Sequence, residues 1–469
     1  YHQKAVNWMY MTEPSPDADN KPSYWPRGKV MGGSSSINAM VYVRGNPKDF
    51  DEWSEAGNPG WSYKEVLPYF KKMESWQNGA DNFRGGDGPL KVSEVSKQLH
   101  PLCDNFLSAA QEIGMKLNPD MNGEKQEGVG NYQITTHKGQ RMSSSRAYLW
   151  PINHRSNLTV LKKALVTKVL IKDKKAYGVK YLKSDKTHEL LASREVILSA
   201  GSINSPQLLQ LSGVGPKKIL EQVSVPLVYD SPAVGENLQD HPGVYCEYPV
   251  NISTFNTEFN ITKMIKHGFN WLFNGMGPIS TPAATCLAFF NTNKILDRPN
   301  AQIHFSPFSY HYSPLSKFDL PGYPAILTGT CILNPETKGS VFISSKDPMQ
   351  PPIIEHSLWD SKNDYTNMVE ALKKLSNIMS SKPISKYILK NPIKELNDND
   401  IEEFVKNNSF LGYHASGTCA MGDNGILNSD LTVKKVRNLR VIDASIMPKI
   451  IRGNTNASVI IIAEKGADH

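Results

Sequence analysis

The residues best suited to chemistry lie in two short stretches near the carboxyl end of the chain. His414 stands in "YHASGTCAMG" (Tyr413–Gly422), where small residues leave room around the imidazole. Further on, "GNTNAS" carries Asn454 and Asn456 just before an apolar run that begins at Ala457. An imidazole can accept a proton near neutral pH, and an amide can polarise an oxygen without competing for that proton. A lone histidine is more often structural, and asparagines at a helix start are usually caps, so these stretches alone leave both interpretations open.

A ligand-binding loop is indicated near the amino end, in "WPRGKVMGGSSSINAMVYVRG" (Trp25–Gly45). Its Gly-Gly pair is followed by three serines and an asparagine. Glycine carries no side chain that would keep the backbone away from a ligand. No G-x-G-x-x-G fingerprint of the dinucleotide-binding kind precedes this loop. The loop therefore predicts a close backbone contact without naming the ligand.

A fourth stretch, "GSINSPQLLQLSGVGP" (Gly201–Pro216), predicts a turn from a strand into a helix. Ser202 or Asn204 can cap this helix, and Pro206 lies early in it, where its missing N–H is tolerated. The amide groups at such a helix start suit a phosphate or another anion. An ordinary strand-turn-helix joint explains the same residues equally well.

The elements that must position these residues show a mixed pattern. Residues 158–201 predict a β-meander whose last run, "EVILSAG", has the continuous apolar character of a central buried strand. Helical periodicity occurs at Pro101–Ile113 and Tyr365–Met379, and a further helix begins at about Ala457. Residues 245–334 predict the body of a second domain with long loops. Its antiparallel sheet takes strands from "RPNAQIHFSP", "PAILTGTCILNP" and "GSVFISSKDP".

Composition excludes several functional classes. The 469 residues carry a net charge of +7 without long basic runs, so we expect no binding to nucleic acid. The five scattered cysteines contain no C-x-x-C pair, which argues against a disulfide framework or a zinc site and mildly favours a reducing compartment. The apolar run "ASVIIIA" is too short to cross a bilayer. The sequence leaves the location open, with the cytoplasm or a peripheral membrane position favoured.

Taken together, these four stretches resemble the glucose–methanol–choline (GMC) family of flavin oxidoreductases, above all its choline-dehydrogenase-like branch. Residues 28–51 resemble the first family signature, with Met31 where leucine is commoner, and residues 201–215 resemble the second. "VGENLQDHP" (Val234–Pro242), the His414 stretch and "GNTNAS" follow in the order and spacing of the family. The resemblance covers nearly the whole chain. It implies an α/β (α+β) fold, with a Rossmann-like FAD-binding domain and a second domain on an antiparallel sheet flanked by helices.

The resemblance also implies the site. His414 is the expected general base and Asn456 the second active-site residue, while no metal is needed. FAD is expected to bind without a covalent bond, because the position that carries the attachment histidine in some members is Ile37 here. The expected FAD contacts come from the Gly-Gly-Ser loop, from an adenine-contacting valine, and from the start of the closing helix: Gly32, Gly33, Ser34, Asn38, Met40, Val166, Asp443, Ala444, Asn454 and Thr455.

The chain departs from the family pattern at its amino end. The family begins with a βαβ unit that carries G-x-G-x-x-G, and no such unit is found here. The sequence therefore predicts an incomplete chain that lacks on the order of 80 residues, and we expect residues 1–469 alone not to retain FAD. The expected FAD-binding domain comprises residues 1–53, 155–245 and 410–469, and the expected substrate-binding domain comprises residues 54–154 and 246–409.

The activity implied is oxidation of a small alcohol to an aldehyde or ketone, with hydride transfer to flavin N5 and a rate that rises through one ionisation near neutral pH. A dehydrogenase is favoured, and an oxygen-using oxidase stays open. So do a FAD-holding lyase or photodecarboxylase and a catalytically inactive homologue, although the cysteine and arginine pair of such decarboxylases finds no match near Cys286 and His304. The electron acceptor, which could be oxygen, a quinone or another compound, is undetermined. A membrane surface is a possible partner, and the chain is expected to be a monomer or a homodimer.

Overall fold

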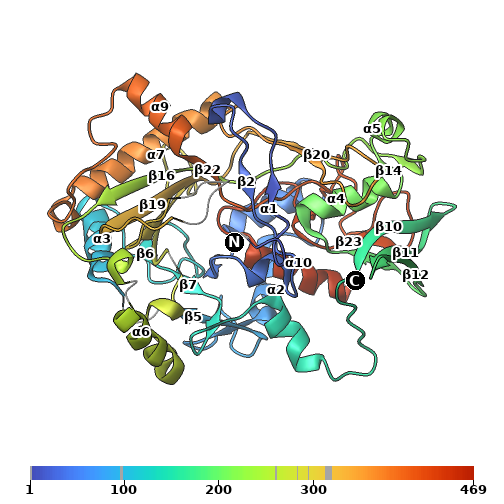
Figure 1. Ribbon diagram of the computed structural model, residues 1–469, viewed down its shortest axis with the longest axis horizontal. Helices are drawn as coiled ribbons and strands as arrows, with labels where there is room; N and C mark the ends of the chain where they lie inside the picture. The colour runs from blue at the N-terminus through green and yellow to red at the C-terminus, as the bar shows by residue number, and fades with distance from the viewer. Residues whose placement is uncertain (1–2, 96–98, 259–260, 283, 294, 312–318) are drawn as a thin grey trace.

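The computed structural model describes residues 3–95, 99–258, 261–282, 284–293, 295–311 and 319–469. Two large hydrophobic cores lie next to each other along the long axis of the molecule (Figure 1). The main helices are α1 (Pro47–Glu55), α2 (Tyr63–Met73), α3 (Pro101–Glu112), α4 (Gly201–Leu211), α5 (Lys217–Gln222), α6 (Ile261–Asn274), α7 (Lys362–Ser380), α8 (Lys382–Ser385), α9 (Asp398–Asn408) and α10 (Asn456–Asp468).

The first core is built on a six-stranded antiparallel sheet, as the sequence predicts for the second domain. Its strand order is β22 (Ser409–Leu411), β16 (Pro242–Pro249), β19 (Ala325–Ile332), β18 (Ala301–Ser306), β17 (Cys286–Phe290) and β6 (Gly128–Asn131). Helices α3 and α7, both predicted from their periodicity, pack against this sheet with their apolar residues. The sheet therefore has one face in the core and another that is available to a site.

The register of this sheet places particular residues side by side on the open face. Tyr245 of β16 and His304 of β18 both pair with Gly329 of β19. Along β16, Tyr245 is partly exposed while its neighbours Val244 and Cys246 are buried, which is the alternation of a strand with one face in the core. Gly329 leaves room for the ring of Phe410, which stacks on Tyr245 with a centroid distance of 3.8 Å.

The second core contains the predicted meander, formed by β10 (Leu165–Lys172), β11 (Lys175–Lys183) and β12 (Lys186–Leu191). Beyond it, β13 (Val196–Leu198) pairs in parallel with β23 (Leu439–Val441), and β13 leads into α4. The prediction of a central buried strand at "EVILSAG" is wrong for the described residues. Among the described residues β13 pairs with β23 along one edge only, and Ile197 is 45% exposed while Val196 and Leu198 are buried, so one face of this strand is open.

Two further predictions about local structure are corrected. The helix α4 begins after Ala200 without a side-chain cap, because the hydroxyl of Ser202 donates to the carbonyl of Ala415 and the amide of Asn204 donates to Tyr10. The run "GSVFISSKDP" does not extend the large sheet. It forms β20 (Ser340–Phe342), which pairs with β21 (Ile353–Glu355) in a small sheet of its own. The remaining short strands are β1 (Tyr10–Met11), β2 (Tyr24–Trp25), β3 (Val41–Tyr42), β4 (Glu74–Trp76), β5 (Leu90–Glu94), β7 (Gln133–Ile134), β8 (Thr136–His137), β9 (Gln140–Arg141), β14 (Val214–Gly215) and β15 (Tyr229–Asp230).

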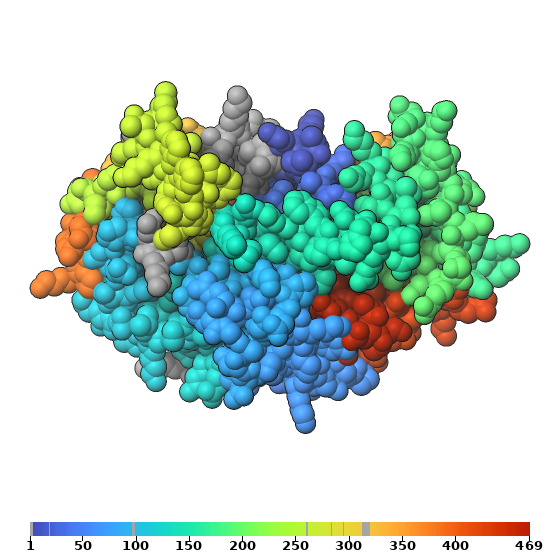
Figure 2. Space-filling view, turned by 90° about the horizontal axis from the view of Figure 1, so that it is seen from below, coloured from blue at the N-terminus to red at the C-terminus, as the bar shows by residue number. Residues whose placement is uncertain are grey.

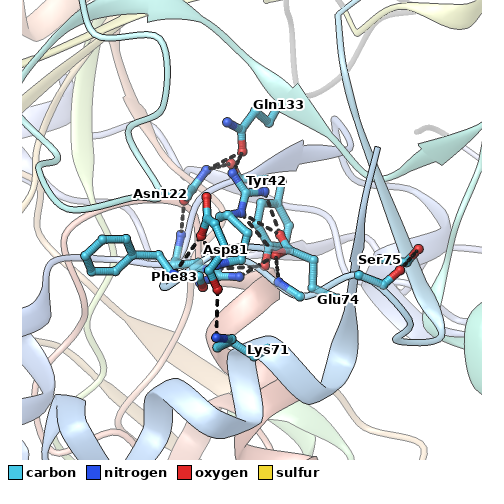
Figure 3. A network of polar contacts seen from close by, with 12 residues as sticks. Tyr42, Lys71, Glu74, Ser75, Asp81, Phe83, Asn122 and Gln133 are labelled. Carbon is cyan, nitrogen blue, oxygen red and sulfur yellow. Dashed lines mark hydrogen bonds and ion pairs between the residues drawn. The ribbon is translucent and has the colours of Figure 1, made fainter. Parts of the chain in front are cut away.

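A buried ionic network anchors the segment that follows the Gly-Gly-Ser loop (Figure 3). The carboxylate of Glu74 accepts hydrogen bonds from the guanidinium groups of Arg44 at 2.5 Å and Arg84 at 2.6 Å. Arg84 also donates to Asp120 and to Gln133. Both arginines and Glu74 are almost completely buried. Because buried charges need such partners, this network ties β3 to β4 and to the loop around Arg84.

All five cysteines are buried free thiols, which agrees with the absence of a disulfide framework expected from the sequence. The aromatic loop region predicted between residues 245 and 334 falls partly on residues 259–260, 283, 294 and 312–318, which lie outside the described residues.

Candidate active site

His414 lies on the strand-to-turn segment that follows β22. The guanidinium of Arg27 donates to the carbonyl of Tyr413, and the backbone amide of His414 donates to Oδ1 of Asp240 at 2.7 Å. Tyr413 adopts a φ of 64°, which is uncommon for a residue other than glycine. These contacts turn the chain so that the imidazole of His414 meets a second histidine, His241.

The directions of the hydrogen bonds define which nitrogen of His414 is free to act. Nε2 of His241 lies 3.0 Å from the carbonyl oxygen of Ile451, which can only accept, so this Nε2 carries the proton of His241. Nδ1 of His241 is then an acceptor, and it lies 2.9 Å from Nδ1 of His414. His414 must therefore carry its proton on Nδ1. Its Nε2 keeps a lone pair, and the side-chain amide of Asn454 donates to it at 3.0 Å.

Asp240 supports both histidines through their backbones. Its Oδ1 accepts the amide hydrogens of His241 at 2.8 Å and of His414 at 2.7 Å, whereas none of the described residues hydrogen-bonds its Oδ2. Burial raises the pKa of this carboxyl to about 7. Asp240, His241 and His414 are close enough together to resemble a metal site. The two Nδ1 atoms are donor and acceptor to each other, and Oδ1 of Asp240 accepts two backbone amides, so we assign no metal to these residues.

A second series of hydrogen bonds crosses the open face of the sheet beside His241 and His414. The amide of Gln302 donates to the hydroxyl oxygen of Tyr132 at 2.9 Å, and this hydroxyl lies 2.5 Å from Nδ1 of His304. With its oxygen accepting from Gln302, Tyr132 donates its proton to Nδ1 of His304. His304 then carries its own proton on Nε2. Gln302 also reaches Oδ1 of Asn454 at 3.4 Å, so the two series of hydrogen bonds meet at Asn454.

The electrostatics keep these imidazoles neutral at pH 7. Burial lowers the pKa of His414 well below its usual value, and the neighbouring His241, His304 and Arg27 add to this effect because they oppose a positive charge there. Burial likewise lowers the pKa of His241 to about 3 and that of His304 to about 4. Since a neutral imidazole is the form that accepts a proton, His414 is in its basic form over the physiological range.

The predicted cofactor loop is compact but half-open to solvent. Gly32 and Gly33 adopt φ values of 87° and 53°, and a side chain on Gly32 would collide with Ser36 and Ser145. Ser34 accepts the amide hydrogen of Gly28 with its hydroxyl oxygen at 3.1 Å. No residue from Gly32 to Asn38 is buried. A Cβ on Gly33 would meet no atom within 4 Å, so open space lies over this glycine.

Asn38 and Met40 hold the far end of this loop. The side chain of Asn38 accepts from the amide of Met40 at 2.9 Å and from the guanidinium of Arg141 at 2.7 Å. Met40 adopts a φ of 64°, and its carbonyl accepts from the amide of Thr135 at 2.8 Å. Val166, the expected adenine contact, is half-buried on β10.

Asp443 lies at the carboxyl end of β23 and joins it to the start of α4. Its Oδ2 accepts from the amide of Gly201 at 2.8 Å and from the hydroxyl of Ser205 at 2.6 Å, while its Oδ1 accepts twice from Ser445. All four hydrogen bonds come from the protein. The carboxylate therefore fixes the joint between β23 and α4, and Ala444 follows it, half-buried, as the first residue of a short 3₁₀ turn.

The structure brings one predicted residue to an unexpected place. Asn454 is expected from the sequence to contact the cofactor and Asn456 to serve the reaction, but the amide on Nε2 of His414 belongs to Asn454. Thr455 is the cap residue of α10, and Asn456, half-buried, is the first residue of that helix. Five polar residues that the structure places here have no role predicted from the sequence, although all except Tyr132 lie in stretches quoted above: Asp240, His241, Gln302, His304 and Tyr132.

Sequence comparisons match nearly the whole chain. Family profiles described as GMC oxidoreductase match residues 6–243 and 335–463. An oxygen-dependent choline dehydrogenase of Photobacterium profundum is 40% identical over 470 residues, which is 98% of this chain and 82% of the relative. The mitochondrial choline dehydrogenase of Mus musculus is 37% identical over 476 residues, which is 98% of this chain and 78% of the relative.

Solved structures show the same fold. Pyridoxine 4-oxidase from Mesorbium loti is similar with a TM-score of 0.88 and 25% identity, covering 99% of this chain and 88% of that one. A formate oxidase of Aspergillus oryzae with the substitution R554K is similar with a TM-score of 0.90 and 23% identity, covering 99% and 88% of the two chains.

Proposed function

As a member of the GMC oxidoreductase family, this chain is an FAD-dependent enzyme that oxidises CH–OH donors, and we propose that His414 is its general base. It has the fold of these flavoproteins, with a Rossmann-like FAD-binding domain and a second domain on an antiparallel sheet. The observation that carries the proposal is the hydrogen-bond chain from the Ile451 carbonyl through His241 to His414. This chain leaves Nε2 of His414 unprotonated and directed at Asn454.

In the proposed reaction, Nε2 of His414 takes the hydroxyl proton of the alcohol. The N–H of His304 donates to the alcohol oxygen and stabilises the negative charge that develops there. FAD held against the loop from Gly32 to Asn38 would supply the acceptor for the hydride that leaves the α-carbon, and loss of that hydride and of the hydroxyl proton would give the carbonyl. The proton removed from oxygen stays on His414 until it exchanges with solvent.

The two asparagines of "GNTNAS" take different roles in this proposal. Asn454 donates to Nε2 of His414 in the resting site and holds the ring in place. An alcohol that enters must replace this donor with its own hydroxyl group. Asn456, two residues further along at the first turn of α10, is proposed to face the substrate. As an amide it orients the alcohol oxygen without taking its proton.

The residues present fit the FAD that the family requires. Open space over Gly33 and the half-exposed loop from Gly32 to Asn38 allow a flat ring or a pyrophosphate to approach the backbone. At the start of α4 the amide of Gly201 already donates to Asp443, and no residue of the cap position occupies the amides that follow, so those amides suit an anionic group. We propose that FAD lies against these two segments and the turn at Ala444, with the following set in contact: Gly32, Gly33, Ser34, Asn38, Met40, Val166, Asp443, Ala444, Asn454 and Thr455. In this proposal Asp443 contributes through its backbone, because its carboxylate is fully engaged.

The domain division expected from the sequence belongs to the same proposal. Residues 1–53, 155–245 and 410–469 hold FAD, and residues 54–154 and 246–409 cover the substrate. In support, the open face of the six-stranded sheet supplies His304 and Gln302, while the loops next to α10 and β16 supply His414 and His241.

We favour a dehydrogenase, because the curated relatives at 37–40% identity are named choline dehydrogenases. The test is anaerobic incubation of the FAD-loaded enzyme with a panel of alcohols that includes choline, while the flavin absorbance is recorded. Bleaching by one alcohol supports the proposal, and failure of every alcohol would favour a lyase, a decarboxylase or an inactive homologue. Air is then admitted: fast return of the oxidised spectrum identifies an oxidase, and slow return identifies a dehydrogenase.

A further inference from the structure

The helix α6 is unusual because none of its described residues is buried. It stands away from the body of the molecule in Figure 1 and projects at the rim of the surface in Figure 2. Its large apolar side chains nevertheless point to solvent: Ile261 is 82% exposed, Leu272 67% and Phe273 73%. A surface helix normally turns its apolar stripe to the core, so this stripe needs another explanation.

The exposed apolar residues share one side of the helix. With about 100° of rotation per residue, Ile261, Ile265 and Leu272 fall within a narrow sector, and Phe269 adjoins it. The rings of Phe269 and Phe273 are stacked, with centroids 6.0 Å apart. Together with Met264, these residues form a continuous apolar face, which we call the α6 face.

A contact at the edge of this face helps to fix the orientation of the helix. The indole nitrogen of Trp271 donates to the carbonyl of Gly139 at 2.8 Å, in the hairpin between β8 and β9. Lys263 pairs with Glu258 at 2.8 Å. The helix is therefore tied to the body at Trp271, beside the α6 face, and the exposed residues of that face point outward.

The charges around the α6 face are positive. Between Glu258 and Asp297 the sequence contains no acidic residue. On α6 itself Lys263 and His267 pair with Glu258, and Lys266 adds a further positive charge. Lys138, at the tip of the neighbouring hairpin, lines a hollow of about 320 Å³ together with Phe273. Burial lowers the pKa of His137, and the positive charges of Lys138, Lys91 and Arg146 lower it further, which shows how basic this edge is.

We propose that the α6 face docks on an anionic lipid surface, with the helix lying in the plane of the membrane. A basic amphipathic helix with aromatic and aliphatic residues on its apolar side is suited to this position. At 1.5 Å per residue, α6 is about 21 Å long, shorter than the bilayer core of about 30 Å. Among the described residues, no helix has the length and apolar character needed to cross a membrane. A second copy of the chain fits less well, because the basic edges of two α6 faces would repel each other.

The test is sedimentation of the full-length, FAD-loaded enzyme with lipid vesicles. One set contains phosphatidylcholine alone, and the other contains about one third phosphatidylserine. We expect binding to the anionic vesicles that is at least about tenfold stronger than to the neutral ones and that weakens with salt. Leu272→Asp with Phe273→Asp should reduce this binding about tenfold or more, and Lys266→Gln should reduce it measurably.

Matched controls carry the same changes at the far end of the molecule. Leu191→Asp alters a 70% exposed leucine on β12, and Lys186→Gln alters a lysine at the start of that strand. Both should bind like the unaltered enzyme. Absence of binding to anionic vesicles, or equal binding by the α6 variants and the unaltered enzyme, would overturn the proposal. The proposal would also be overturned if sedimentation velocity showed a dimer that Phe273→Asp converts to a monomer. The α6 face would then be a contact between two copies of the chain. Lys266→Gln serves as the mild variant if the double change impairs folding.

Discussion

His414 is held through Nδ1, so its Nε2 is the atom that can take a proton from an alcohol. The hydrogen bonds that orient this ring start at the carbonyl of Ile451, which accepts from His241, and His241 in turn accepts from Nδ1 of His414. In isolation an imidazole exchanges its proton between the two nitrogens, and half of the possible arrangements would leave Nε2 protonated and useless as a base. At the scale of the residue, proton abstraction therefore depends on His241 as much as on His414.

Replacing His241 tests this dependence. In His241→Phe, Nδ1–H of His414 loses its acceptor, and the ring is free to protonate on Nε2. We expect the rate of flavin reduction by the alcohol to fall roughly 10–100-fold, the usual cost of losing an outer partner that orients a functional imidazole, with little change in KM. His241→Gln, whose amide oxygen can accept from Nδ1–H, should restore part of the rate. If both variants reduce flavin at the normal rate, the tautomer is not controlled by His241.

The pH dependence of the reaction follows from burial of the base. A base must be deprotonated, so the rate rises with pH through the pKa of His414 and is constant above it. Burial lowers that pKa well below the ordinary 6.5. The sequence-based expectation of an ionisation near neutrality is therefore replaced by one at acid pH. Stopped-flow reduction measured from pH 5 upward should already be near its maximum at pH 7.

Asp240 supplies the control for that profile. Its carboxyl is the group at the site whose pKa burial raises to about 7. If the rate changes with pH near neutrality and this change disappears in Asp240→Asn, the ionisation belongs to this carboxyl. If the change of rate near neutrality survives in Asp240→Asn and disappears in His414→Ala, it would contradict the assignment of a lowered pKa to His414.

Sequence reasoning found His414 because small neighbours set it apart, and it missed the residues that make the histidine a base. Asp240 and His241 stand in a quoted stretch, but nothing in "VGENLQDHP" says that it meets His414, which lies more than 170 positions later. Gln302 and His304 lie on β18, and Tyr132 follows β6 on the other side of β17, so their contact depends on a strand order and register that the sequence does not reveal. Contacts of this length are decided by tertiary packing and not by local pattern.

At the scale of elements, periodic and capped segments were the predictable ones. Helices α3 and α7 carry a clear apolar period, and the structure confirms them together with the predicted helix α10 and strands β18 and β19. The cap of α4 was wrong, because Ser202 and Asn204 find partners in other segments. The assignment of β20 was wrong, because its alternation is equally suited to pairing with β21, which no local signal identifies.

The buried network around Glu74 should be essential to the element that follows the cofactor loop. In Glu74→Ala, Arg44 and Arg84 would stay buried without their shared carboxylate. Leaving such charges uncompensated typically costs about 3–5 kcal/mol, so we expect a large drop in the urea midpoint of unfolding. The matched control is Glu221→Ala, which removes the exposed partner of Lys217 and should cost less than about 0.5 kcal/mol. Equal midpoints for the two variants would rule out this role of the network.

At the scale of the whole molecule, the cofactor should be held without a covalent bond. The loop position considered for attachment is Ile37, which has no nucleophilic atom and ends the short 3₁₀ turn of Gly33–Ser36. Precipitation of the holoenzyme with acid should therefore leave the yellow flavin in the supernatant. Flavin that stays in the washed pellet would contradict this expectation and would require a nucleophile elsewhere in the site.

The two cores come together where His414, His241 and the open face of the six-stranded sheet meet, and the central claim is that this meeting point abstracts the hydroxyl proton. The most direct measurement is the single-turnover rate at which an alcohol bleaches the flavin, without oxygen, in the unaltered enzyme and in His414→Ala. We expect the variant to keep its FAD and to reduce it roughly 10²–10⁴-fold more slowly. His188→Ala, at an exposed histidine on β12, should react at the normal rate. Bleaching of His414→Ala at close to the normal rate would show that another residue is the base.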